Sequence, residues 1–246
     1  MALTSPSIMD IRIDSLIEGA HHAQGTVVVI DVLRAYTTAS VAFSKGVERI
    51  ILVAEPEEAL KLRGQGAGDL CMGEVGGKKP SGFDFGNSPH ELSQVADADL
   101  CGKTIIQSTR AGTVGACAVP AGAPMFAASF VIAEATCEAI RQAGSKQVTI
   151  LAMGSAGLVR GDEDELCALY LRNRLQGRQP DVEATMSLAR CSHEAAPYGS
   201  PEMPFKPVAD LEIAMQIDTF DFAIRVVDEE GLLVARRHSV GGSSAK

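Results

Sequence analysis

Tryptophan is absent from the 246 residues, and aromatic side chains of all kinds make up only 4% of them. Proteins that bind single-stranded nucleic acids stack the bases on aromatic side chains, so this chain has few residues for that purpose. An excess of basic residues is also missing, because 31 acidic residues outnumber 22 basic ones and the formal net charge is −9. Since Lys and Arg supply most of the affinity for a phosphate backbone, we expect no nucleic-acid partner.

Signals for membranes, secretion and disulfides are missing too. No apolar run approaches the ~18 residues of a membrane-spanning helix. Residues 1–10 lack the basic segment and apolar stretch of a signal peptide. The six cysteines are scattered and include no CxxC pair, which favours reduced, buried thiols over disulfides or a zinc site. These absences predict a cytoplasmic protein with no membrane partner.

Two common nucleotide-binding motifs are also missing. Residues 154–157, Gly-Ser-Ala-Gly, lack the GxGxxG spacing of dinucleotide-binding folds, and no GxxxxGKS or GxxxxGKT pattern forms a P-loop. A phosphotransferase that acts on nucleotides is therefore disfavoured.

The chain does contain an alternation of strand and helix patterns. Residues 26–30, Thr-Val-Val-Val-Ile, form a β-branched run that is typical of a strand buried on both faces of a parallel sheet. Strand patterns followed by helical patterns continue to residue 176. Residues 222–227 and 232–236 flank a turn, as the strands of a hairpin do. We predict an α/β fold: a mostly parallel sheet flanked by helices, with an antiparallel C-terminal hairpin.

A length of 246 residues suits one large domain or two small ones. We predict a single α/β domain over residues 1–246. The alternative is two α/β subdomains divided near residues 120–145, with the site between them. Residues 197–207 contain four prolines and are expected to form a surface loop.

Asp31 follows the apolar strand at its C-terminal end, where open α/β sheets bind their ligands. Arg34 follows in the same loop, and a helical pattern begins at Thr37 and Thr38. A carboxylate in this position can instead serve only to cap the next helix. This segment alone leaves both interpretations open.

Residues 73–89 break the alternation with a long loop rich in glycine and proline. Loops of this length inside a compact domain are usually functional or disordered. Phe83 and Phe85 would anchor the loop, so we expect it to be ordered and functional. The polar side chains it can present are Glu74, Lys78, Lys79, Asp84, Asn87 and Ser88.

Two later segments can also contribute to a site. Residues 108–113, Ser-Thr-Arg-Ala-Gly-Thr, lead from a strand into a helix, where backbone N–H groups and the helix dipole can bind an anion. Residues 162–165 are four acids that begin another helix. The helix dipole accounts for most of this cluster, although one or two of these carboxylates can face a pocket.

Together these motifs resemble the 2-phosphosulfolactate phosphatase family, over about residues 11–236. The motifs that carry the resemblance are Asp31-Val32-Leu33-Arg34-Ala35 with Thr37-Thr38, Gly73-Glu74, Gly82-Phe83-Asp84-Phe85-Gly86-Asn87-Ser88-Pro89, Thr109-Arg110-Ala111-Gly112-Thr113, Glu163-Asp164 with Cys167-Ala168, and Asp218 with Phe220-Asp221-Phe222-Ala223. The resemblance implies an α/β enzyme that uses Mg²⁺ to remove phosphate from a sulfonated 2-phospho acid, a step towards coenzyme M in methanogens.

The resemblance also implies the residues of the site and a small anionic phosphorylated substrate. Because Mg²⁺ prefers oxygen ligands, we expect two or three metal ligands among Asp31, Glu74, Asp84, Glu163 and Asp164. The expected catalytic residues are Asp31, Arg34 and Asp84. The expected substrate-binding residues are Lys78, Asn87, Ser88, Thr109, Arg110 and Thr113.

The nucleophile is left open between water and Asp31. A DxDxT motif marks aspartyl-phosphate enzymes, but the residue two after Asp31 is Leu33, which favours water activated by the metal. A non-catalytic anion-binding protein that kept the fold is the main alternative. It would be favoured if the carboxylates failed to converge. A homodimer also stays open.

Arg110 is the residue by which the chain departs from the family pattern. The family's Thr-Asn-Gly-Thr element is one residue longer here, and Arg110 adds a cation. Its side chain can lean over an anion bound at the following helix N-terminus. We expect Arg110 to bind a second acidic group of the substrate, and the alternative is a solvated surface arginine.

Overall fold

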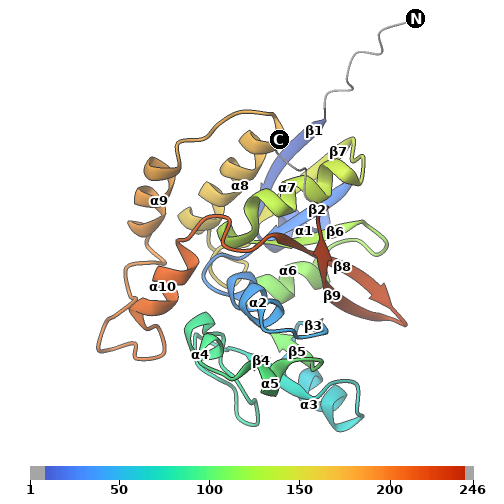
Figure 1. Cartoon of the computed structure of the whole chain (residues 1–246), viewed down its shortest axis with the longest axis vertical. Helices are drawn as coiled ribbons and strands as arrows, with labels where there is room; N and C mark the ends of the chain where they lie inside the picture. The colour runs from blue at the N-terminus through green and yellow to red at the C-terminus, as the bar shows by residue number, and fades with distance from the viewer. Residues whose placement is uncertain (1–8, 242–246) are drawn as a thin grey trace, which may run out of the picture.

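A computed structural model describes residues 9–241 and contains one nine-stranded sheet (Figure 1). The order of its strands is β1-β7-β2-β6-β8-β9-β3-β5-β4. Four strands at one end run parallel to one another: β1 (Asp10–Ser15), β7 (Gln147–Ala152), β2 (Thr26–Ile30) and β6 (Met125–Ala128). Three strands at the other end are also mutually parallel: β3 (Arg49–Val53), β5 (Thr104–Ser108) and β4 (Leu70–Gly73).

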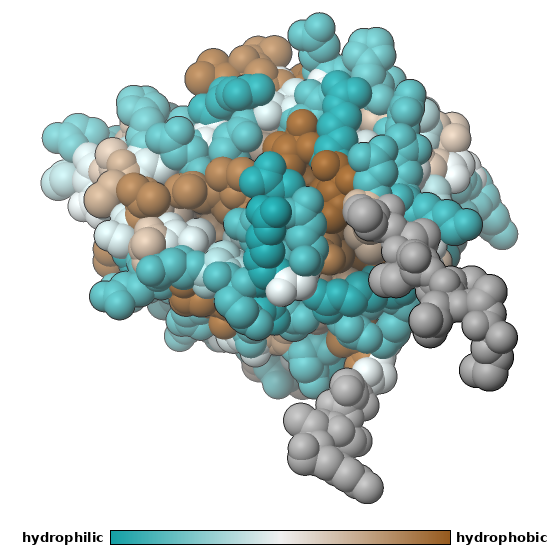
Figure 2. Space-filling model, turned by 90° about the horizontal axis from the view of Figure 1, so that it is seen from above, coloured by the Kyte–Doolittle hydropathy of each residue, from teal (hydrophilic) through white to brown (hydrophobic). Residues whose placement is uncertain are grey.

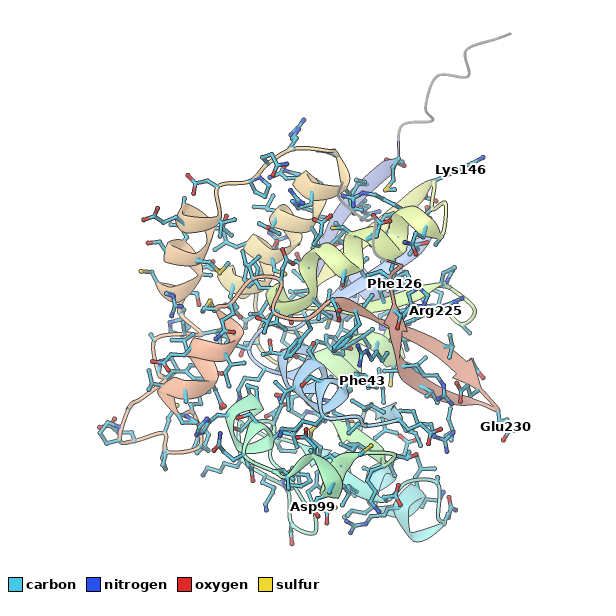
Figure 3. All side chains as sticks on the ribbon, in the orientation of Figure 1. Phe43, Asp99, Phe126, Lys146, Arg225 and Glu230 are labelled. Atoms are coloured by element: carbon cyan, nitrogen blue, oxygen red, sulfur yellow. The ribbon has the colours of Figure 1, made fainter. Side chains whose placement is uncertain are left out.

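The C-terminal hairpin joins these two parallel parts. Strands β8 (Phe222–Glu229) and β9 (Leu232–Ser239) are antiparallel to each other, and each is antiparallel to its outer neighbour, β6 or β3. The tip of the hairpin, with Glu230, projects from the body (Figure 3). The predicted fold class is therefore confirmed. The central place of the hairpin in the sheet was not part of the prediction.

Both faces of β2 are buried, as its β-branched run predicts. Val27 and Val29 pack in a central hydrophobic cluster that also contains residues of α2 (Ala35–Ser44) and α6 (Gly112–Ala118). Val28 and Ile30 point to the opposite face and pack in a second cluster, with α7 (Ala133–Gln142) and α8 (Asp162–Leu175). This alternation is the period of two that a strand imposes on its side chains.

The central cluster is shared by both parallel parts of the sheet. Ile50 and Leu52 of β3 belong to it, whereas Ile51 and Val53 pack on the other face with α3 (Pro56–Gly64). Phe43, labelled in Figure 3, lies on α2. Its ring meets the ring of Phe222 edge to face, with 6.4 Å between centroids. A shared core supports our interpretation of one domain, which stays a prediction.

The remaining helices are α1 (Leu16–His21), α4 (Pro89–Ser93), α5 (Asp97–Leu100), η1 (Phe130–Ile132), α9 (Val182–Arg190) and α10 (Val208–Ala214). Helices α9 and α10 form the left side of Figure 1, and residues 191–207 join them. None of the helices within residues 9–241 combines the length and apolar character needed to cross a bilayer. In Figure 2, hydrophilic residues surround the hydrophobic stripes on the face seen from above. A cytoplasmic location stays a prediction.

Candidate active site

Strand ends from both parallel parts of the sheet meet at one cavity of about 230 Å³. Asp31 and Arg34 come from the end of β2, Glu74 from the end of β4, and Arg110 from the end of β5. After β7, the loop at Gly154 and the start of α8 complete this side. Three antiparallel pairings separate the two parallel parts, so their strands run in opposite directions in the sheet. The ends of β2 and β5 nevertheless meet, because the N–H of Gly112 donates to the Asp31 carboxylate.

Asp31 links two helices at the base of the cavity. The backbone N–H of Ala35 donates to Oδ1 (2.9 Å), and that of Gly112 donates to Oδ2 (2.8 Å). A methyl group at position 112 would lie 2.8 Å from Oδ2, so glycine is needed for this approach. Asp31 therefore holds the start of α2, and it also lines the cavity. Burial, reinforced by the charge of Glu74, raises the pKa of Asp31 to about 6.

Glu74 fastens the long loop to the turn after β5. The N–H of Arg110 donates to Oε1 (2.9 Å), and the N–H of Gly77 donates to Oε2 (2.6 Å). The residue before Glu74 must be glycine, because a Cβ at Gly73 would lie 1.8 Å from the carbonyl oxygen of Ser108. These contacts hold the Glu74 carboxylate beside that of Asp31, on the wall of one cavity.

Glu163 and Asp164 are the two buried members of the acidic cluster at the start of α8. Asp164 accepts hydrogen bonds from the N–H groups of Val32 and Gly154, both at 2.8 Å, and it ties the loops after β2 and β7 together. Its pKa is raised well above the usual range by burial and by the charges of Glu163 and Asp31. Glu163 lines the cavity, and burial raises its pKa to about 7.

Arg34 lines the cavity, and hydrogen bonds to other protein groups hold its guanidinium in place. Nη1 donates to Asp210 Oδ2 (2.5 Å) and to the carbonyl oxygen of Phe205 (2.8 Å). Asp210 is fully buried on α10, and its other oxygen accepts from the hydroxyl of Ser88 (2.6 Å) and the N–H of His90 (2.9 Å). Sequence patterns do not predict this role of Asp210, because an acid in the first turn of a helix is ordinary.

Asn87 and Ser88 are neighbours with different surroundings. Asn87 is buried and lines the cavity, and its Oδ1 has no hydrogen-bond partner within residues 9–241. Ser88 caps α4 by accepting a hydrogen bond from the N–H of Glu91 (3.0 Å). Its hydroxyl donates to Asp210, and Ser88 is not among the residues that line the cavity. Only Asn87 is brought to the cavity.

Other predicted residues lie away from the cavity lining. Asp84 Oδ2 accepts from Arg63 (2.8 Å) and from the N–H of Cys71 (2.7 Å), which turns its carboxylate to the outside of β4. The Lys78 ammonium lies 5.5 Å from the ring centroid of Phe205. Asp84 is therefore not among the carboxylates that line the cavity, and Lys78 is not among its lining residues either.

Thr109 and Thr113 bond to each other instead of facing the cavity. The N–H of Thr109 donates to Thr113 Oγ1 (2.8 Å), and this hydroxyl donates to the carbonyl oxygen of Thr109 (2.9 Å). Both are buried and shape the turn between β5 and α6. Arg110 does line the cavity, but its guanidinium bonds Glu55 (3.1 Å), and about a third of its side chain is exposed.

Comparison with known proteins shows the family of the chain. The sequence model of the family described as 2-phosphosulpholactate phosphatase matches residues 12–200. The chain belongs to this family. A protein of Bacillus subtilis (strain 168) named "Probable 2-phosphosulfolactate phosphatase" is 28% identical over 217 residues, which are 86% of this chain and 92% of the relative.

Two further relatives carry the same name. The protein of Thermus thermophilus is 36% identical over 151 residues, 61% of each chain. That of Pseudothermotoga lettingae is 33% identical over 205 residues, 76% of this chain and 87% of the relative. The predicted family is thereby confirmed. Residues beyond 200, among them Asp210, lie outside the stretch that the family model matches.

Within residues 9–241, no group of three or more His, Cys, Asp or Glu side chains is arranged to hold a metal ion. Mg²⁺ does not require such a group, since it usually keeps several waters and takes one or two carboxylates together with substrate phosphate. Two buried oxygens of the cavity residues, Glu163 Oε2 and Asn87 Oδ1, have no hydrogen-bond partner among the described residues. These oxygens, with Asp31 and Glu74 on the same wall, fit a hydrated Mg²⁺.

The segment between α9 and α10 lines part of the cavity. Glu194, Tyr198, Met203, Phe205 and Lys206 all line it. The sequence predicts only a surface loop here, because prolines mark the turns but say nothing of what the loop covers. In the structure, this segment adds aromatic and charged side chains to the cavity lining.

Proposed function

We propose that this chain is a Mg²⁺-dependent phosphatase for a phosphomonoester of a small acidic metabolite. The proposed substrate is 2-phosphosulfolactate, hydrolysed to 3-sulfolactate and phosphate, or a close analogue. The observation that carries the proposal is the convergence of Asp31, Glu74 and Glu163 with Arg34 in one cavity. Family membership and the names of the relatives support the same activity.

The size of the cavity favours a small substrate. Pockets for drug-sized ligands have volumes of about 300–1,000 Å³, and this cavity has about 230 Å³. Its wall carries both charge signs, as a phosphate ester with a bound cation requires. A purely anion-binding protein would need only the basic groups, so the buried carboxylates favour the enzyme over that alternative.

Glu163 and Asn87, with Glu74, are the residues proposed to hold Mg²⁺ through direct or water-mediated contacts. When bound, Mg²⁺ would neutralise charge on the phosphoryl oxygens and help to orient them. The Arg34 guanidinium, held by Asp210, is proposed to bind phosphoryl oxygens, because arginine suits the geometry of phosphate.

Asp31 is the proposed general base. With a pKa of about 6 it is mostly ionised at pH 7.5, and a base titrating near the working pH is efficient. Water would attack phosphorus while the bond from phosphorus to the substrate oxygen breaks. Asp31 would take the proton of the attacking water, and the leaving oxygen would be protonated by solvent. Both Asp31 oxygens accept backbone hydrogen bonds, which orient the carboxylate for this role.

Phosphate release from 2-phosphosulfolactate tests the proposal. We expect turnover with Mg²⁺, loss of turnover in EDTA, and recovery when excess Mg²⁺ is returned. Full turnover in thoroughly chelated protein would remove the metal from the mechanism. Binding of the substrate without any phosphate release would favour the anion-binding alternative.

A further inference from the structure

Within the part of the chain that the structure describes, three cations line the cavity, and they differ in how closely an acidic side chain pairs with each. Arg34 is paired with Asp210 at 2.5 Å, and Arg110 with Glu55 at 3.1 Å. The acid nearest to Lys206 is Glu194, whose Oε2 lies 3.9 Å from Nζ. This distance is too long for a hydrogen bond. Lys206 is therefore the cavity cation with the weakest ion pair.

Lys206 is also enclosed. Only 19% of its side chain is exposed, and within residues 9–241 the one ion pair of its ammonium is the long one with Glu194. The Nζ lies 5.4 Å from the ring centroid of Tyr198, and the Arg34 guanidinium carbon lies 5.9 Å from the same centroid. Enclosure of an ammonium is unfavourable unless an anion compensates it. Both cations therefore lie within cation–π distance of the Tyr198 ring.

The backbone fixes Lys206 in this position. Its N–H donates to the carbonyl oxygen of Met203 (2.9 Å), and its own carbonyl oxygen accepts from the N–H of Gly199 (2.9 Å). These two bonds close residues 199–206 into a compact turn. Lys206 thus lines the cavity from a turn that backbone hydrogen bonds hold together.

We propose that Lys206 binds the acidic group of the substrate that is not the phosphate, a carboxylate or a sulfonate. The inference rests on the proposed function and assigns the residue that recognises the second acid of its phosphomonoester substrate. The sequence predicts this role for Arg110. In the structure, Glu55 already pairs with the Arg110 guanidinium, so the second acid falls to Lys206.

Three substrates with the same three-carbon skeleton distinguish which acidic group of the substrate Lys206 contacts. Isopropyl phosphate carries only the phosphate, 2-phospholactate adds a carboxylate, and 2-phosphosulfolactate adds a sulfonate as well. Lys206→Met removes the charge and keeps the apolar stem. We expect it to lower kcat/KM about 10- to 100-fold, mainly through KM, for the substrates with the contacted acid. The value for isopropyl phosphate should change less than about twofold.

Matched variants guard against a merely structural effect. Lys206→Arg should keep most of the discrimination, and Lys146→Met, at an exposed lysine outside the cavity (Figure 3), should change nothing. Arg110→Ala should cost all three substrates less than about threefold. Equal losses of Lys206→Met on all three substrates, or no loss on any, would overturn the proposal. So would a selective loss in Arg110→Ala alone.

Binding separates this inference from the proposed function. In EDTA, calorimetric titration of wild type and Lys206→Met with 2-phosphosulfolactate and isopropyl phosphate should show the same selective weakening. If wild type releases no phosphate but this difference persists, the phosphatase proposal fails and the anion subsite stands. If wild type turns over and the variant binds both compounds as wild type does, only the subsite fails.

Discussion

Arg34 and Asp210 form an ion pair that is almost fully buried, with side-chain exposures of 3% and 0% and 2.5 Å between Nη1 and Oδ2. The pair connects the loop after β2 to α10, 176 positions later in the chain. Through Ser88 and His90, Asp210 also holds the start of α4. One carboxylate thus fixes three segments around the cavity.

Removal of Asp210 should therefore destabilise the protein strongly. Asp210→Ala leaves the Arg34 guanidinium buried and unpaired, and we expect a loss of about 3–5 kcal/mol in the free energy of unfolding, measured with urea. Asp210→Asn keeps the shape and should lose less stability but still lower kcat/KM. Arg12→Ala, which breaks the exposed pair with Asp14, is the control and should cost less than about 1 kcal/mol. Equal effects at both sites would refute the proposed role of Asp210.

Glu163 should make the metal-free protein less stable at high pH. Its pKa is about 7 when folded and 4.5 as a reference, so the folded state binds more protons than the unfolded state between these values. The titration of Glu163 therefore lowers the free energy of unfolding as the pH rises from 4.5 to about 7, and it has little effect below pH 4.5. Glu163→Gln removes the titration, and it should be more stable than wild type by about 1–3 kcal/mol at pH 8 in EDTA.

At pH 4.5 this advantage should disappear, because the wild-type carboxyl is then protonated in the folded state. Urea unfolding at both pH values measures the difference. An identical effect of the substitution at pH 4.5 and pH 8 would mean that Glu163 is not the titrating group.

Mg²⁺ should stabilise the folded protein, because a ligand that binds only the native state raises its melting temperature. Wild type should melt higher in millimolar Mg²⁺ than in EDTA at pH 8. Glu163→Gln and Asn87→Ala should lose most of this increase, because they remove the two unpartnered oxygens. Lys146→Met should keep it. An undiminished shift in both cavity variants would rule these oxygens out as ligands.

The fold could be predicted because its signals are local. A β-branched run such as residues 26–30 marks a buried strand, and the alternation of strands with helices marks a parallel sheet. The insertion of the hairpin between the two parallel parts was not predictable, since it depends on pairing between β8 and β6 and between β9 and β3. Nothing in the hairpin sequence names those neighbours.

The site residues were likewise predictable only where their signals are local. Asp31, Glu74 and Glu163 could be selected because each follows a strand or begins a helix, and the cavity brings them together. Asp84 is turned outward by Arg63, a partner 21 positions away that no local pattern reveals. Lys206 belongs to a loop that tertiary packing brings to the cavity, and the sequence of the loop does not reveal this packing. Tertiary contacts decided both of these outcomes.

The most direct test of the account compares two aspartates by phosphate release from 2-phosphosulfolactate in Mg²⁺. Asp31 lies on the cavity wall, whereas Asp84 lies away from it and is paired with Arg63. Asp31→Asn should lose at least ~100-fold in kcat, and Asp84→Asn should stay within about threefold of wild type. Retained activity in Asp31→Asn, or an equal loss in both variants, would contradict the proposed site.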